Sequence, residues 1–508
     1  MFKAVATQVS VCLFAPWVGV LVAFGLRGEW NGALLVAFFL ALVLGSHAVI
    51  TIPRDVLLHT LLALGFYATA FQGLLGPLDG ALGAVWFLLI ILFSLIQVGC
   101  VFLSSLFFRN LAFRAVVFPF GMVAFEFFRH QATKLYDGSG LTFCLFGQAV
   151  ASDSLLLQSA DLGGVWMLSF YGVALGAAIS IWFHLLLSLR FRIAYMVVVL
   201  GMFGSAYTYG YYRLRNTDTL RIGSETILVY VCPEKPGVSQ LSKLSHSIQA
   251  RKDRYRWEEI IVVYPETCIT WQSNPDALPE QNALLQLSKL PNVMVIVGAW
   301  YPATSDSSRN VSIIAKDGQV VTAVDKAHLA TFVESKPFGT NHLVAAGLVP
   351  QVVIRNVAAA EPIDQAVWRS RTLKAAPSVC YDLFFSESFR RFPADRIGFS
   401  TCSLDETFDG NGVFRKLSRM HSTLRAVEMR QPLVRSSLGG FSGVFDRTGR
   451  VMNPLELNAD FAMFQLEPEY LETVYERWGD WFPIACCTIC IASVFVDRVL
   501  VRAPRDES

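Results

Sequence analysis

Apolar segments of about 20 residues alternate with short polar turns over residues 1–212 of the chain. An α-helix of that length crosses the ~30 Å hydrocarbon core of a bilayer, so each segment is a candidate membrane span. We expect the first segment to be a span rather than a cleaved signal peptide, because no small-residue cleavage site follows it and further spans come at once. The pattern predicts seven spans, at residues 5–26, 33–52, 56–76, 82–108, 111–128, 165–187 and 193–212.

The pattern changes between residues 213 and 480, where charges become frequent and apolar runs shorten to the length of strands. Helical periodicity lies between several runs, at residues 241–257, 280–289 and 411–430. Lys316-Asp-Gly318 adds a hairpin signal of the Asp-Gly type. Alternating strands and helices are typical of an α/β layer fold. The expected strands are residues 226–231, 259–264, 293–300, 311–315, 319–324, 376–380, 396–401, 433–437 and 443–445.

A last apolar segment, residues 481–501, predicts an eighth span near the end of the chain. The expected fold is therefore a membrane α-helical bundle of about eight spans that carries one extracytoplasmic α/β domain. The expected domains are residues 1–212 with seven spans, 213–480 with the α/β fold, and 481–508 with the final span and a cytoplasmic tail.

The composition is that of a membrane protein. Of the 508 residues, 54% are hydrophobic and only 16% are charged, and the mean hydropathy is +0.46. Such a chain is too apolar for a set of soluble domains. The net charge is +2, and no run of Lys and Arg with interleaved aromatic residues could follow a phosphate backbone. We therefore expect no nucleic acid among its partners.

Charges in the short loops predict the orientation of the spans, because Lys and Arg are retained on the cytoplasmic side. The loops on one face carry more positive charge than those on the other. The first set is Arg54, Arg109, Arg114, Arg190 and Arg192, and the second is Arg27, Arg129 and Lys134. This excess places the N-terminus in the cytoplasm and, after an odd number of spans, residues 213–479 outside it.

Three expected strands end at residues that together could perform covalent catalysis. Glu266 and Lys326 each lie just past an apolar run, and Cys380 closes another. A nucleophilic cysteine needs a base to take its proton and a cation to hold the charge that develops. Glu266 is the candidate base, Lys326 is the cation, and the backbone N–H of Tyr381 would help to stabilise an oxyanion. The ten cysteines and eight histidines do not form the two ligand pairs of a structural zinc site, so we expect no metal and no other cofactor.

The order Glu, Lys, Cys, with each residue at the end of a strand, resembles the nitrilase superfamily. Further motifs are Gln158-Ser-Ala-Asp-Leu-Gly-Gly164, Tyr264-Pro-Glu266, Asp325-Lys-Ala-His-Leu329, Val379-Cys-Tyr381, Arg425-Ala-Val-Glu428, Arg435-Ser-Ser437 and Gly479-Asp-Trp481. With the membrane segments, they resemble the membrane-embedded branch of that superfamily, apolipoprotein N-acyltransferase. The resemblance implies an α-β-β-α sandwich, triad roles for Glu266, Lys326 and Cys380, and an assisting role for Glu334.

The resemblance also implies an activity in lipoprotein biosynthesis. A fatty acyl chain would move from a phospholipid to Cys380 as a thioester, and then to the N-terminal amine of a lipoprotein. A covalent intermediate lets one site accept from a lipid and later donate to an amine. Flanking spans would hold the site against the bilayer in which both substrates lie. The implied location is the bacterial inner membrane, with the catalytic domain on the periplasmic side.

The chain departs from the usual pattern of this family on the pocket side. Phe-Gly-Glu appears as Phe332-Val333-Glu334, and Cys-Tyr-Glu appears as Cys380-Tyr381-Asp382. An Asn-Asp-Ala-Trp-Phe-Gly stretch is replaced within residues 400–408, and Asn-Asn-Gly has become Leu438-Gly439-Gly440.

Two other interpretations stay open. Nitrilase-like membrane proteins of plasmid conjugal-transfer systems would keep the acyl-enzyme chemistry with a different acceptor, and the altered residues 400–408 suit such a branch. The second interpretation is a structural membrane protein in which the triad is a relic, although the intact candidate residues argue against it. A nitrilase or amidase acting on a small soluble substrate would leave eight spans without a role.

Overall fold

The computed structural model describes most of the chain from residue 111 onward. The described ranges are 111–137, 145–183, 187–215, 227–252, 259–272, 278–302, 308–330, 334, 368–369, 374–390, 397–409, 412–467 and 471–502, with isolated positions between residues 20 and 94. Apart from those isolated positions, the expected spans at residues 5–26, 33–52, 56–76 and 82–108 lie outside the described residues.

The described strands form two sheets. The larger has eight strands in the order β12-β13-β1-β2-β4-β5-β6, with β3 paired to β4, and the smaller has the order β11-β10-β9-β8-β7. The larger sheet contains β1 (Ile227–Val231), β2 (Glu259–Val263), β3 (Ile269–Thr270), β4 (Val293–Pro302), β5 (Ser308–Lys316), β6 (Gln319–Asp325), β12 (Glu456–Leu457) and β13 (Ala462–Leu466). The smaller contains β7 (Trp368–Arg369), β8 (Lys374–Val379), β9 (Ile397–Asp405), β10 (Leu433–Leu438) and β11 (Gly443–Phe445).

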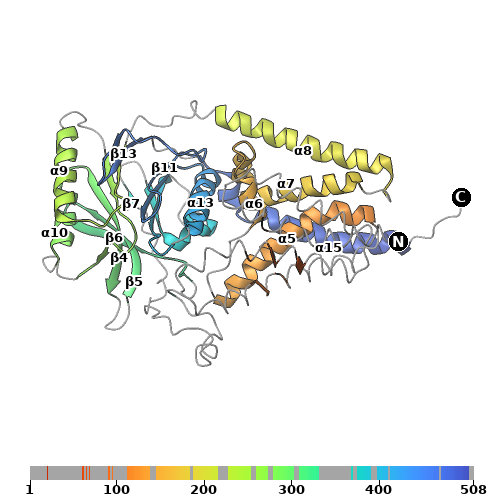
Figure 1. Ribbon diagram of the computed structural model, residues 1–508, viewed down its shortest axis with the longest axis horizontal. Helices are drawn as coiled ribbons and strands as arrows, with labels where there is room; N and C mark the ends of the chain where they lie inside the picture. Colours follow the sequence, from red (N-terminus) through yellow and green to blue (C-terminus); the bar gives the residue numbers. More distant parts are fainter. Residues whose placement is uncertain are drawn as a thin grey trace, which may run out of the picture.

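Helices cover the outer face of each sheet, so this part of the chain has four layers (Figure 1). The larger sheet is covered by α9 (Val238–Lys252) and α10 (Pro279–Ser288), and the smaller by α13 (Val413–Met429). An apolar core, with Val229 and Phe399 fully buried, lies between the sheets. The α-β-β-α sandwich that the sequence resemblance implied is confirmed.

The apolar runs in the sequence correspond to strands that are buried on both faces. In β2, Ile260 and Val262 belong to the core beneath the outer helices, whereas Ile261 and Val263 belong to the core between the sheets. Successive side chains of a strand point to opposite faces, so a strand between two cores must be apolar throughout. The parallel pairing of β2 with β1 and β4 agrees with this pattern.

The hairpin predicted from Asp317-Gly318 is confirmed, whereas some of the predicted strand boundaries need correction. β5 and β6 pair antiparallel, and Asp317 and Gly318 have φ values of 53° and 79°, as a type I′ hairpin turn requires. The expected strand at residues 376–380 ends at Val379. Strands β3, β7, β12 and β13 were not expected. β13 is strand because it pairs antiparallel with β1 along its whole length.

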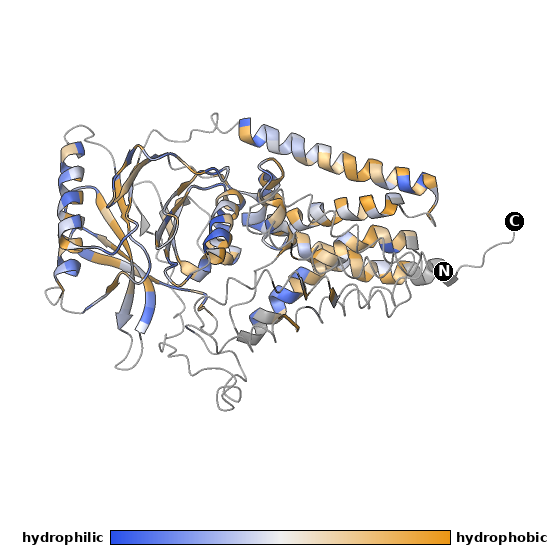
Figure 2. Ribbon diagram, in the orientation of Figure 1, coloured by the Kyte–Doolittle hydropathy of each residue, from blue (hydrophilic) through white to orange (hydrophobic). Residues whose placement is uncertain are grey.

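Apolar helices extend from the sandwich (Figure 2). They are α5 (Leu111–Asp137), α7 (Ala160–Phe183), α8 (Leu189–Arg215) and α15 (Trp481–Arg502). Within the described ranges, two helices are long and apolar enough to cross a membrane, Leu156–Trp182, which contains nearly all of α7, and α8. They overlap the expected spans at residues 165–187 and 193–212. A bundle of about eight spans stays a prediction.

α7 has a break at Gly163 and Gly164, where the backbone is not helical. Gly164 has a φ of 65°, a left-handed value that glycine adopts without steric cost. A Cβ at this position would lie 2.5 Å from the ring of Tyr475. The apolar part of the helix therefore starts at Val165, where the sequence predicts the sixth span to begin.

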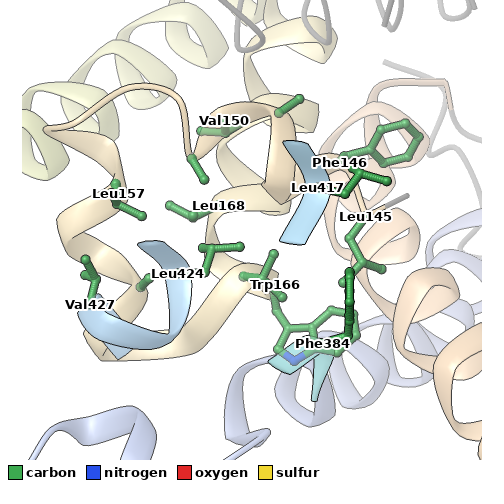
Figure 3. Close-up of a cluster of buried hydrophobic side chains, with 14 of the residues drawn as sticks. Leu145, Phe146, Val150, Leu157, Trp166, Leu168, Phe384, Leu417, Leu424 and Val427 are labelled. Atoms are coloured by element: carbon green, nitrogen blue, oxygen red, sulfur yellow. The ribbon is translucent and has the colours of Figure 1, made fainter. Parts of the chain in front are cut away.

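One apolar cluster joins the sandwich to these helices (Figure 3). It contains side chains from α6 (Phe146–Val150), from α7, from α13 and from the segment just after Cys380. Figure 3 labels Leu145, Phe146, Val150, Leu157, Trp166, Leu168, Phe384, Leu417, Leu424 and Val427. Shared packing thus fixes the helices against the part of the sandwich that carries Cys380.

Candidate active site

The ends of β2, β6 and β8 bring Glu266, Lys326 and Cys380 together. Lys326 Nζ lies 2.9 Å from Glu266 Oε1. The Cys380 thiol interacts with the Glu266 carboxylate through charge and as a hydrogen-bond partner. All three residues are buried. β2 and β6 belong to the larger sheet and β8 belongs to the smaller, so the cluster forms only when both sheets are assembled.

Cys380 directly follows β8 and is the first residue of a short 3-10 helix, η5 (Cys380–Phe384). Its φ is 45°, in the left-handed region that non-glycine residues rarely adopt. Such a conformation costs on the order of 1–3 kcal/mol and persists only where surrounding contacts enforce it. The turn places the thiol at the end of the strand beside the two charged side chains.

A second carboxylate, that of Glu334, forms an ion pair with Lys326. The distance from Lys326 Nζ to Glu334 Oε2 is 2.7 Å. Asn310 Nδ2 donates hydrogen bonds to Oε1 of both carboxylates, at 2.8 Å to Glu266 and 2.7 Å to Glu334. The ammonium and the amide together hold two like charges in one buried site.

Burial and the neighbouring charges shift the pKa values in this cluster. Burial raises the pKa of Glu266 above its usual value, although Lys326 opposes the shift. Burial alone would lower the pKa of Lys326, but Cys380 and the two carboxylates hold it well above its usual value. Burial and then the Glu266 carboxylate raise the pKa of the Cys380 thiol well above its usual value. The resting thiol is therefore protonated, and Glu266 is a stronger base than an exposed carboxylate.

Contacts from both sheets orient Glu266. Its Oε2 accepts a hydrogen bond of 3.0 Å from the N–H of Asp405, and its own N–H donates to the carbonyl of Leu404 at 3.3 Å. Gly298 in β4 permits the close approach, because a Cβ there would lie 2.4 Å from the Cα of Glu266. The carboxylate is thus fixed before any substrate arrives.

Asp382 connects the cysteine turn to the segment that follows Lys326. Its carboxylate accepts hydrogen bonds from the N–H groups of Ala327 at 3.1 Å and His328 at 2.9 Å. It also accepts one of 3.2 Å from the N–H of Val379. Asp382 is fully buried. The change from Cys-Tyr-Glu to Cys-Tyr-Asp therefore keeps a carboxylate that ties two parts of the site together.

Tyr381, the expected source of an oxyanion-binding N–H, follows Cys380 in η5. Its side chain is buried, and its ring packs edge-on against Phe385 with the centroids 5.1 Å apart. The position directly after the candidate nucleophile suits the expected contribution of its backbone N–H, which stays a prediction.

The two stretches that depart most from the family pattern meet in space. Glu406 and Arg435 are both fully buried, and Arg435 Nη2 lies 2.5 Å from Glu406 Oε2. Ser437 Oγ donates to the same oxygen at 2.6 Å. A Cβ on Gly440 would lie 1.7 Å from it, so this position requires glycine. The departures at residues 400–408 and 438–440 therefore form one buried unit, adjacent to the Asp405 that contacts Glu266.

Two residues of this arrangement were not identified from the sequence. Asn310, which bridges the carboxylates, is only 2% exposed. His328 belongs to the Asp325-Lys-Ala-His-Leu329 motif, which by itself predicts no role for it. A buried amide at the start of an apolar run demands polar partners. A polar amide beside an apolar run was therefore the available sequence signal for Asn310. It does not identify the partners of the amide.

No family model matches the chain. Curated relatives do match it. The apolipoprotein N-acyltransferase of Rhodopseudomonas palustris is 23% identical over 394 residues, which cover 72% of this chain and 70% of that protein. The apolipoprotein N-acyltransferase of Gloeobacter violaceus is 27% identical over 380 residues, which cover 69% of this chain and 67% of that protein.

Solved structures also align with the chain. An amidase from a Nesterenkonia species has 14% sequence identity and a TM-score of 0.34, with coverage of 51% of this chain and 95% of that one. A nitrilase superfamily member from Saccharomyces cerevisiae has 16% identity and a TM-score of 0.34, with coverage of 50% and 95%. The resemblance that the sequence motifs predicted is confirmed by the curated relatives, and the chain is similar to the apolipoprotein N-acyltransferases over roughly 70% of its length.

Proposed function

We propose that this chain is an N-acyltransferase that moves a fatty acyl chain from a phospholipid, through a thioester on Cys380, to the N-terminal amine of a lipoprotein. One observation carries the proposal: Lys326 contacts both Glu266 and Glu334 in a buried cluster beside the Cys380 thiol. The names of the similar proteins support the reaction class and the acceptor.

The first half-reaction acylates the cysteine. Glu266 takes the thiol proton as the sulfur attacks the ester carbonyl carbon of the phospholipid. Lys326 and the N–H of Tyr381 stabilise the oxyanion of the tetrahedral intermediate. The C–O bond then breaks, and the lysophospholipid alcohol leaves with the proton that Glu266 held. The product is an acyl thioester on Cys380.

The second half-reaction runs through the same groups. The neutral amine of the acceptor attacks the thioester carbonyl, and Glu266 takes the proton that the new amide nitrogen must lose. The C–S bond breaks, and the proton returns to the sulfur to restore the thiol. Glu334 and Asn310 orient Lys326 and Glu266 in both halves, because they contact these groups directly.

The surface of α8 supports a membrane setting. Val197 and Val198 are 62% and 70% exposed, and Tyr211 and Tyr212 lie exposed at the end that also carries Arg215. Apolar residues with an aromatic and basic end are typical of a helix that faces lipid and stops at the membrane surface. Figure 2 shows this change along α8, from an apolar stretch to a hydrophilic end beside the sandwich.

The proposal therefore includes the bacterial inner membrane, about eight spans, and a catalytic domain at residues 213–480 on the periplasmic side. Alkaline phosphatase fused after Tyr212 is expected to be active, and the same reporter at the C-terminus is expected to be inactive. The reverse pattern would overturn the orientation.

The reaction is tested by incubating the purified protein with phospholipid and measuring its intact mass. We expect an acyl adduct that hydroxylamine removes and that Cys380→Ser lacks, because the serine hydroxyl is far less acidic than a thiol. An equal adduct on both proteins would place the acyl group elsewhere. Complementation of a strain depleted of its own lipoprotein N-acyltransferase then tests the acceptor, and an adduct without rescue would point to a different acceptor.

A further inference from the structure

Polar contacts run from helix α5 to the segment that carries Lys326. They begin at Lys134 in the last turn of α5, whose Nζ lies 2.9 Å from Glu387 Oε1. His130 Nε2, one turn earlier, lies 3.8 Å from the same oxygen. Glu387 belongs to α12 (Ser386–Arg390), which directly follows the cysteine turn. One carboxylate near the nucleophile is thus paired with a helix outside the sandwich.

His328 continues the contacts from Glu387 to the site. Its Nε2 lies 3.8 Å from Glu387 Oε1, and its Nδ1 lies 3.2 Å from Asp382 Oδ1. The ring stacks on Phe385 at a centroid distance of 3.9 Å and an angle of 6°. Its backbone N–H donates to Asp382 as well. His328 is therefore held on several sides, two residues after Lys326.

We propose that His328 is a positioning residue for Lys326, and that Glu387 makes this positioning depend on α5 through Lys134. The inference rests on the proposed function only in treating Lys326 as part of the reacting cluster. Neither His328 nor Glu387 touches the reacting atoms. Both act on the placement of the ammonium, which must be held to a fraction of an ångström for efficient catalysis.

The burial and charge of Glu387 and its partners on α5 indicate that their contacts restrain α12, which a loose surface ion pair would not do. The side chain of His130 is 4% exposed and that of Glu387 is 27% exposed. Burial would raise the pKa of Glu387, but His130 and Lys134 hold it below its usual value. The carboxylate therefore stays charged, and a partly buried charge that contacts the Lys134 ammonium and two histidine rings is more strongly held than an exposed pair.

Other contacts hold α12 against the same side of the molecule. Ser386 Oγ lies 2.8 Å from the hydroxyl of Tyr475 in α14 (Val474–Trp478). Arg390 Nη2 lies 3.4 Å from Asp480, just before α15. The segment after the cysteine is thus fixed by α5 through Glu387 and by the approach to α15 through Arg390. A shift of these helices would therefore change the positions of Cys380 and Lys326.

The test measures carbamidomethylation of Cys380 by iodoacetamide in the full-length protein in detergent, at one pH and without acyl donor. Peptide mass spectrometry reports this cysteine alone. The variants are Glu387→Gln, Lys134→Gln, the double variant and His328→Asn. The control is Lys243→Gln on α9, which removes an ion pair of 2.9 Å with Asp460, away from the site.

We expect each single variant to slow the alkylation about three- to tenfold, and the double variant to be no slower than the worse single one, because coupled residues are not additive. A charge effect through space predicts otherwise. Removing a carboxylate favours the thiolate and would speed the reaction, whereas removing an ammonium would slow it. Opposite signs for Glu387→Gln and Lys134→Gln would therefore overturn the proposal, as would wild-type rates in both or in His328→Asn.

A second measurement separates positioning from folding. Lys134 is 40% exposed in its side chain, so Lys134→Gln is expected to unfold at the wild-type temperature while its kcat falls and its KM for phospholipid stays unchanged. A changed KM with a normal kcat would contradict the role. If the wild-type protein forms no acyl adduct, the proposed function fails, yet the alkylation series still decides this inference.

Discussion

Glu428, near the end of α13, accepts a hydrogen bond of 3.1 Å from the backbone N–H of Val165. Val165 is where α7 resumes after its glycine break. The first N–H groups of a helix lack acceptors within the helix, so a carboxylate from the sandwich supplies one. Thr473 Oγ1 also donates to the Glu428 carbonyl at 2.7 Å. The end of α13 thereby connects α7 to the segment that leads to α15.

The stability of the protein is expected to depend on pH through Glu428. Burial raises the pKa of its carboxyl from 4.5 to about 7, although Arg425 opposes the shift. Because the folded state binds the proton more tightly, the contribution is complete below pH 4.5 and is lost as the pH rises to about 7. It amounts to at most ~3 kcal/mol.

The unfolding temperature in detergent should therefore fall over this range, and Glu428→Gln should reduce the slope. Glu476, whose pKa burial also raises to about 7, is unchanged in both proteins and contributes equally. An identical slope in wild type and Glu428→Gln would contradict the assignment.

Glu266→Gln is expected to separate thiol reactivity from turnover. The Glu266 carboxylate is, after burial, the largest cause of the raised pKa of Cys380. Removing its charge should lower the thiol pKa and shift the pH profile of iodoacetamide alkylation to lower pH. Acyl transfer should nevertheless fall by about 10²-fold or more, because the proposed general base is lost. Alkylation that slows at every pH would show that the carboxylate does not destabilise the thiolate.

Asn310→Ala is expected to weaken the site and the fold together. The amide bridges Glu266 and Glu334, and its loss would remove a donor from two buried carboxylates at a cost of about 1–3 kcal/mol. Unfolding in detergent measures the loss of stability, and single-turnover acylation measures the loss of rate. Asn282→Ala, at a half-buried position of α10 where the amide oxygen accepts a hydrogen bond of 3.3 Å from Gln286, should change both quantities much less. Full activity in Asn310→Ala would show that the amide is not needed to orient the two carboxylates.

Gly440→Ala is expected to destabilise the protein by about 3 kcal/mol or more, because the new methyl group would displace Glu406 from buried Arg435. Gly237→Ala is the matched control, since a Cβ at Gly237 meets no atom within 4 Å, and it should change stability by less than about 0.5 kcal/mol. Equal unfolding temperatures for the two variants would show that the Glu406 side chain moves without cost.

Much of the candidate site could be predicted because its signals are local. The apolar runs that end at Glu266, Lys326 and Cys380 depend on the period of side chains along a strand, and the Asp317-Gly318 hairpin depends on two φ values. These features depend only on residues that are close together in the sequence. They also sufficed to predict alternating strands and helices, because each element needs an apolar face to be covered.

The tertiary structure decided the partners of these residues. Asp161, at the start of α7, pairs with Arg430 after α13 at 2.9 Å across 269 positions of sequence, and no local pattern indicates that choice. The positive φ of Cys380, the pairing of β13 with β1, and the bridge made by Asn310 have the same origin. Periodicity specifies which face of an element is buried, whereas the atoms that meet a buried polar group come from other elements and exist only once the sheets and helices have packed.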